Sequence, residues 1–157
     1  MKKLTHTFTA VTLSAALVAT AAFAASHAGD VPPAVGARQA QMQMVGYHTG
    51  VLGSIAKGEM PYDSSMVDSS AKNLAALAGM EHATLLIAGT EQGAVAGSRA
   101  KPDVWSDAAG FKAKFGDMQT AAMAMVGAAD AAAVGAAMGA LGGSSKACHE
   151  TYRGPKN

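Results

Sequence analysis

The residues best suited to chemistry lie near the C-terminus, where Cys148 is followed directly by His149. Cys148 is the only cysteine of the chain, so it cannot form an internal disulfide. A thiol can add to a vinyl group, and an imidazole nitrogen can coordinate iron. The pattern Cys-x-x-Cys-His attaches c-type haem. Residues 145–149 read Ser-Lys-Ala-Cys-His, so Ser145 stands where this pattern has its first cysteine.

The Cys-His pair continues the apolar stripe of a predicted helix over residues 131–152. The stripe has alternating spacings of four and three residues, through Val134, Met138, Leu141, Ser145 and Cys148. His149 lies on the adjoining edge, and Arg153, four residues later, shares its face. Arg153 is therefore placed to pair with a haem propionate or to hydrogen-bond near the imidazole. The dipeptide alone also fits a small buried cysteine beside a surface histidine, so both interpretations stay open on this evidence.

Four predicted helices position these residues, over 33–57, 65–88, 107–128 and 131–152. Alanine and methionine are abundant and runs of β-branched residues are missing, which favours helix over sheet. Asp63 or Ser64 is expected to cap the second helix and Asp130 the fourth, while 89–101 reads as a polar, glycine-rich loop. We predict an all-α protein, an antiparallel four-helix bundle in one domain over 25–157. A large prosthetic group would add the apolar surface that an Ala-Met core lacks.

The N-terminus has the features of a secretory signal peptide over residues 1–24. Lys2 and Lys3 precede an apolar run over 10–24, which ends in Ala-Phe-Ala. This run is short for an uncleaved anchor, and no later segment is long and apolar enough to span a bilayer. The sequence therefore predicts an exported, soluble protein of the periplasm. Without the leader, 10 basic residues face 11 acidic ones, a balance that argues against nucleic acid as a partner.

Four sequence blocks together resemble the class II c-type cytochromes, the cytochrome c′ family. The blocks are Arg-Gln-Ala-Gln-Met at 38–42, Lys-Gly-Glu-Met-Pro-Tyr-Asp at 57–63, Lys-Pro-Asp-Val-Trp-Ser-Asp at 101–107 and Ser-Lys-Ala-Cys-His-Glu-Thr-Tyr-Arg at 145–153. They occur in the family's order and cover nearly all of the predicted mature chain. The resemblance implies a four-helix bundle that holds haem c at the end of its fourth helix.

The resemblance assigns the haem attachment to the C-terminal block. Cys148 matches the second haem-linking cysteine and His149 the proximal ligand of the haem iron. Ser145 departs from the family because a serine hydroxyl does not add to a vinyl group as a thiol does. Three outcomes follow: haem c held by a single thioether, haem held without a covalent bond, or a chain without haem. The first is the expectation because most of the motif is present.

The resemblance also assigns residues around the rest of the haem. Arg38 matches a residue expected near the propionates, and Arg153 a basic residue packed near the proximal histidine. Met42 matches the position that faces the other side of the iron. In high-spin members of the family this position crowds an open sixth site, and in low-spin members a methionine there ligates the iron. Ordinary core packing is the alternative for Met42.

The function implied is electron transfer with periplasmic redox partner proteins, with possible binding of NO or CO. A homodimer through the first two helices is expected, and Gly46, Gly50 and Gly53 permit either that contact or internal packing. No enzymatic site is expected, since no serine forms a triad with an oriented acid. His48 and His82 are interpreted as isolated surface or helix-packing residues. The alternative function is a haem-free periplasmic bundle that binds or scaffolds a partner.

Overall fold

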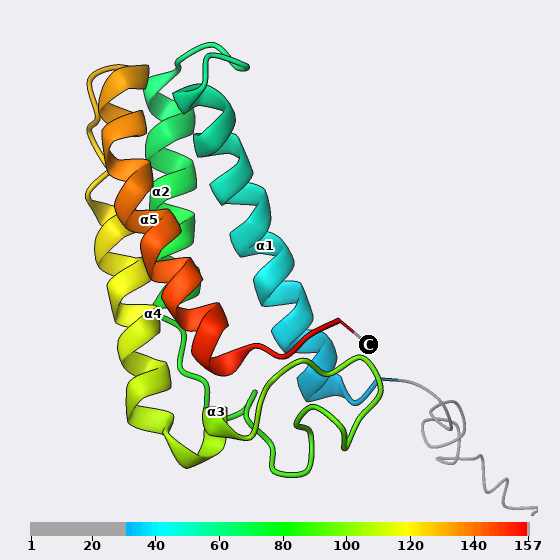
Figure 1. The fold of residues 1–157 in the computed structure, drawn as a ribbon. Coiled ribbons are helices and arrows are strands. Elements are labelled where there is room, and N and C mark those ends of the chain that lie inside the picture. Colours follow the sequence, from blue (N-terminus) through cyan, green and yellow to red (C-terminus); the bar gives the residue numbers. More distant parts are fainter. Residues whose placement is uncertain (1–30, 157) are drawn as a thin grey trace, which may run out of the picture. The chain divides into compact units, whose positions relative to one another are not determined.

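The computed structural model describes residues 31–156, so the predicted signal peptide and His27 lie outside the described part. Its helices are α1 (Pro33–Ala56), α2 (Ser64–Ala78), α3 (Asp103–Ser106), α4 (Ala108–Met123) and α5 (Ala131–Tyr152). α1 packs on α2 and α5, and α4 packs on the same two helices, in the antiparallel arrangement that Figure 1 shows. The described residues form no strand. The all-α four-helix bundle is therefore confirmed, and α3 is a single extra turn.

Aspartates begin three of the helices, as the sequence predicts for two of them. The carboxylates of Asp63, Asp107 and Asp130 each accept a hydrogen bond from the backbone N–H three residues later. Each bond satisfies an N–H that has no partner within its helix. α1 instead begins at Pro33, whose fixed φ suits a first turn. None of the described helices combines the length and apolar character needed to cross a membrane.

The second predicted helix is wrong in its length, because α2 ends at Ala78 rather than at residue 88. The Gln119 amide of α4 donates to the carbonyl of Ala75 in the last turn of α2, at 3.2 Å. A Cβ at Gly79 would lie 2.5 Å from the Gln119 nitrogen, so a side chain there would displace this amide. Beyond Gly79, side chains from elsewhere bind the backbone carbonyls of Leu85 and Leu86. These tertiary hydrogen bonds outweigh the helical propensity of residues 79–88.

The third predicted helix, over 107–128, also differs from the structure. α4 begins at Ala108 and ends at Met123, and residues 124–130 form a turn. Gly127 has φ 78°, a left-handed conformation that favours glycine, and its N–H donates to the Asp68 carboxylate at 2.8 Å. The predicted first and fourth helices agree with α1 and α5, apart from the last residue of the first.

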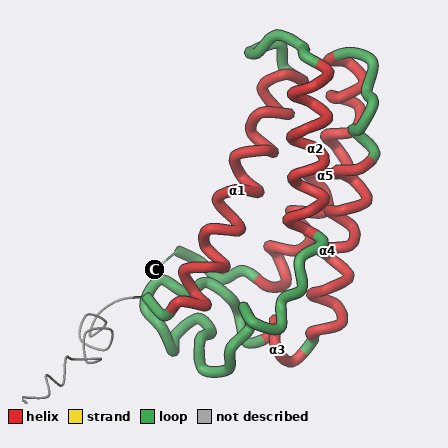
Figure 2. The backbone as a smooth tube through the Cα atoms, turned by 180° about the vertical axis from the view of Figure 1, so that it is seen from behind, coloured by secondary structure: helices red, strands yellow, loops and turns green. Residues whose placement is uncertain are grey.

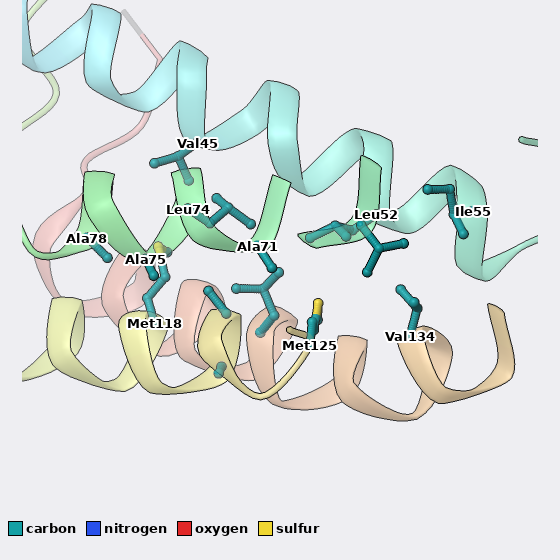
Figure 3. Close-up of a cluster of buried hydrophobic side chains, with 14 of the residues drawn as sticks. Val45, Leu52, Ile55, Ala71, Leu74, Ala75, Ala78, Met118, Met125 and Val134 are labelled. Atoms are coloured by element: carbon teal, nitrogen blue, oxygen red, sulfur yellow. The ribbon is translucent and has the colours of Figure 1, made fainter. Parts of the chain in front are cut away.

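The core lies between α1, α2, α4 and α5 and is built from small and medium side chains. Figure 3 shows this packing, with Val45, Leu52, Ile55, Ala71, Leu74, Ala75, Ala78, Met118, Met125 and Val134 labelled. Alanines on α2 let the neighbouring helices approach closely. Toward its N-terminal end α1 diverges from α2, as both views of the backbone show (Figures 1 and 2). This divergence places the functional site at the end of the bundle where α1 begins and α5 ends.

Candidate haem site

A cavity of about 900 Å³ lies between α1, α4, α5 and the 79–102 loop. Its lining is mainly apolar, with contributions from Val35, Val45, Phe111, Phe115 and Met118. All of the site residues predicted from the sequence line this one cavity, namely Arg38, Met42, Ser145, Cys148, His149 and Arg153. Residues more than 100 positions apart in the chain are thus brought together on facing helices.

Cys148 and His149 are both half-buried in the last turns of α5. Burial raises the pKa of the Cys148 thiol, and the charge of Lys114 partly offsets this effect. Burial also lowers the pKa of His149, and the nearby charges of Arg153 and Arg99 lower it further. The imidazole is therefore neutral near pH 7, which is the form that ligates a metal.

Ser145 lines the cavity one helical turn before Cys148 and is half-buried like it. The helix continues without interruption through both residues, so the register of α5 is regular here. Position 145 is therefore placed as the first cysteine of the attachment pattern would be. Residue 145 differs from that pattern only in its functional group, which is a hydroxyl in place of a thiol.

Met42 does not lie in the closed core. Its side chain is 38% exposed and contributes to the cavity wall, whereas Val45, three residues later on α1, is 7% exposed. The interpretation of Met42 as ordinary core packing is therefore not supported. The position leaves its thioether available to whatever the cavity holds.

Arg38 ties α1 to the 79–102 loop as well as lining the cavity. Its Nη1 donates to the carbonyl of Leu85 at 2.6 Å and to the Thr90 hydroxyl at 3.0 Å. Its Nη2 donates to the Thr90 carbonyl at 2.8 Å and to the Ser98 hydroxyl at 3.4 Å. The guanidinium also lies 5.7 Å from the centre of the Trp105 ring. The resemblance implied a propionate-binding role, and the structure adds a role in fixing the loop.

Replacing Arg38 by lysine is expected to destabilise the protein by about 2–3 kcal/mol, because one ammonium group cannot reproduce the forked hydrogen bonds of a guanidinium. Chemical denaturation followed by circular dichroism measures this loss. Lys112→Ala, at an exposed position of α4, is the control and should change the free energy of unfolding by less than about 0.5 kcal/mol. Equal stabilities of the two variants would contradict a structural role of Arg38.

The cavity is strongly biased toward positive charge. Its lining carries Arg38, Lys57, Arg99, Lys114 and Arg153, and none of the described lining residues is acidic. A haem has a large apolar ring and two carboxylate-bearing propionates. The cavity supplies an apolar wall for the ring, cations for the propionates, an imidazole for the iron and a thiol for one vinyl group. The residues present thus fit haem, and Ser145 limits the fit at the second vinyl group.

Sequence reasoning missed His82, which lines the cavity from the 79–102 loop. The prediction of a helix through residue 88 concealed this position, and no spacing pattern indicates it. His48, by contrast, packs inside the bundle with 7% exposure, and neither ring nitrogen has a partner among the described residues. Glycines 46, 50 and 53 of α1 line the cavity, and a Cβ at Gly46 or Gly50 would meet no other atom within 4 Å.

The fold and the site define a class of protein, a four-helix bundle built to hold a haem at the end of its last helix. A sequence model of the family described as Cytochrome C' matches residues 33–153. The chain therefore belongs to the cytochrome c′ family, whose members are haem-binding cytochromes with covalently bound haem c.

Individual relatives agree with this assignment. A cytochrome c′ of Cereibacter sphaeroides is 38% identical over 132 residues, which cover 83% of this chain and 89% of the relative. A cytochrome c-554 of the same organism is 36% identical over 146 residues, covering 92% and 95%. Among solved structures, cytochrome c′ from Rhodobacter Spheriodes superposes with a TM-score of 0.74 at 35% identity, covering 81% of this chain and 99% of that one. A nitric oxide complex of a cytochrome c prime variant from Alcaligenes xylosoxidans gives 0.65 at 34% identity, covering 78% and 94%.

Proposed function

We propose that this protein is a periplasmic class II cytochrome that transfers electrons between redox partner proteins by means of a single-thioether haem c. The observation that carries the proposal is the cavity itself, which brings Cys148 and His149 of α5 together with Met42 of α1. When bound, the haem supplies the iron redox couple, and the protein holds the ring and tunes its potential. His149 is the protein's ligand to the iron.

The covalent link is a thioether at Cys148. Addition of the Cys148 thiol across one vinyl double bond would place sulfur on one carbon and hydrogen on the other, and it would consume no oxidant. Ser145 forms no such bond, and the second vinyl group stays intact. Retention then depends on the thioether, on His149 and on burial of the ring against side chains such as Phe115 and Met118.

Met42 is proposed to contact the haem on the side away from His149. Its place on the cavity wall supports either ligation of the iron or shielding of an open site. A ligating methionine suits electron transfer, whereas a shielded site also admits small uncharged gases such as NO and CO. One structurally similar relative was solved as a nitric oxide complex, which favours gas binding as a second capacity.

Removal of the Met42 side chain is expected to speed CO binding to the reduced protein at least about tenfold, because either a ligand or a steric shield is lost. A tenfold change corresponds to a decrease of about 1.4 kcal/mol in the activation free energy of CO binding. Flash photolysis measures the rate. A change of the resting spectrum from low to high spin in Met42→Ala would identify ligation, and an unchanged high-spin spectrum would identify shielding. Met44→Ala is the control, because Met44 is 47% exposed and does not line the cavity. Equal CO rates in both variants would refute a haem-facing Met42.

The absorption spectrum of protein matured in a host with haem-attachment machinery tests the function. The proposal predicts a Soret band whose haem resists extraction by acidic acetone. Extractable haem would contradict covalent attachment but would still show that the protein binds haem. A spectrum without any Soret band would contradict the cytochrome assignment and favour the haem-free bundle that binds or scaffolds a partner.

A homodimer is part of the proposal. Met44 and Tyr47 on α1 and Met66 on α2 are exposed apolar side chains, at 47%, 64% and 43% of their surface. Their place on the first two helices supports an interface there, since burial of such side chains favours association. Sedimentation equilibrium is expected to give twice the monomer mass, and Tyr47→Lys should lower it toward the monomer value.

A further inference from the structure

His82 is a half-buried side chain of the 79–102 loop, and it lines the same cavity as Met42 and His149. Its ring packs against two phenylalanines of α4, which also contact each other. The centres of the rings are 4.3 Å apart for Phe115 and 5.4 Å apart for Phe111. Edge and tilted contacts of this kind restrict the plane of the imidazole. His82 is therefore held in a defined orientation although it belongs to a loop.

A hydrogen bond from Gln41 determines which nitrogen of His82 carries the proton. Gln41 is 6% exposed, and its Nε2 donates to the carbonyl of Leu77 at 2.8 Å. The same Nε2 lies 3.4 Å from His82 Nε2. Because an amide nitrogen only donates, a hydrogen bond at this contact requires His82 Nε2 to accept and leaves the ring proton on Nδ1. No hydrogen-bond acceptor for this Nδ1–H is found among the described residues.

The ring is uncharged near pH 7. Burial lowers the pKa of His82, the charge of Glu81 opposes this effect, and the charge of Lys112 adds to it. Glu81 and Lys112 are both exposed and lie 3.4 Å apart, so their opposite charges largely cancel at the ring. The aromatic neighbours bring no further charge. His82 is thus a neutral N–H donor among the side chains that line the cavity, next to Phe111 and Phe115.

We propose that His82 is a hydrogen-bond donor to a small anionic or polar ligand bound beside the haem. His82 reaches the wall that carries Met42, because it contacts Gln41, the residue that precedes Met42. Two cations of the lining already have partners, since Arg38 is bonded to Leu85 and Thr90 and Arg99 to the carbonyl of Gly154. The donor lets the pocket bind ligands that accept hydrogen bonds, in addition to the uncharged gases already considered. This inference rests on the proposed haem site.

Fluoride is the probe, because it is a small anion that binds ferric haem and accepts hydrogen bonds. The holoprotein is used with Met42→Ala, so that Met42 neither ligates nor shields the iron. Absorbance titration is expected to show fluoride binding, and adding His82→Phe is expected to weaken it about ten- to a hundredfold. Such a loss matches a hydrogen bond to a charged group. Phenylalanine preserves the ring packing, and His82→Gln, which retains an N–H donor, should restore most of the affinity.

The inference would be overturned if Met42→Ala and the double variant Met42→Ala, His82→Phe bound fluoride with equal affinity. It would also be overturned if neither protein bound fluoride. It is also overturned if Met42→Ala gives a low-spin spectrum that His82→Phe abolishes, because His82 would then ligate the iron. Failure of the proposed function is distinguishable, since it removes the Soret band altogether. Nitrogen-15 NMR of the histidine rings needs no haem. It is expected to show protonated Nδ1 in His82, and protonated Nε2 would contradict the assignment.

Discussion

Replacing His149 by alanine is expected to abolish the native haem spectrum. His149 lines the cavity beside Cys148, and its lowered pKa keeps the imidazole neutral and able to bind iron. The variant loses the only predicted ligand on α5, and the methyl group of alanine cannot replace it. Absorption and electron paramagnetic resonance spectra of the oxidised and reduced protein measure the change.

Two comparisons separate loss of the ligand from failure to load haem. Glu150→Ala changes the next residue, which is exposed, and its spectrum should be that of the unaltered protein. Added imidazole should restore a nitrogen-ligated spectrum to the His149→Ala protein that retains haem at Cys148. An unchanged spectrum in His149→Ala, before any imidazole is added, would show that another residue ligates the iron.

The substitution Ser145→Cys is expected to create a second thioether bond. Position 145 lines the cavity one turn before Cys148, on an uninterrupted helix, and cysteine there completes the pattern Cys-x-x-Cys-His. Because the second vinyl group becomes saturated, the pyridine haemochrome band should move to shorter wavelength. The new bond also restricts the unfolded chain and should raise the midpoint of thermal unfolding.

Ser144→Cys is the matched control for this change. Ser144 is also half-buried, but it does not line the cavity, and its hydroxyl donates to the carbonyl of Leu141. A thiol at 144 should leave the haemochrome band where it is. If Ser145→Cys leaves the band unmoved as well, either the unaltered protein lacks a thioether or position 145 does not face a vinyl group.

Much of the site was predictable because it lies on regular helices. The spacing of Ser145, Cys148 and His149 on one helix fixes their placement before any tertiary contact is known, whereas Arg153 follows α5 with an extended backbone. Asp130 begins that helix through a bond to Ala133, three residues away, so its effect is local. Local rules of this kind predicted both ends of α5.

The 79–102 loop was not predictable in the same way. Leu85 and Leu86 have helical propensity, yet the bonds that hold them come from Arg38, 47 residues before Leu85, and from Trp105, 19 residues after Leu86. Such contacts arise only when the bundle has formed. The role of His82 depends on them too, since its neighbours Gln41 and Phe115 are far away in the sequence.

The cavity also explains the composition of the chain. The core combines alanine and methionine with valine, leucine and isoleucine, and only 5% of the residues are aromatic. Phe111 and Phe115 lie at the cavity, with Tyr152 in ring contact with Phe111. In the proposed holoprotein the haem would add the missing apolar contacts at this end of the bundle, so loss of haem should lower the stability of the fold.

The intact mass of the purified protein, measured under denaturing conditions, tests the central claim most directly. The account predicts the mass of the polypeptide plus one haem, with the added mass on the peptide that contains Cys148 after proteolysis. Cys148→Ala should return the mass to that of the polypeptide alone. An unmodified polypeptide with a free thiol at Cys148, from a host that attaches haem to c-type cytochromes, would contradict the account.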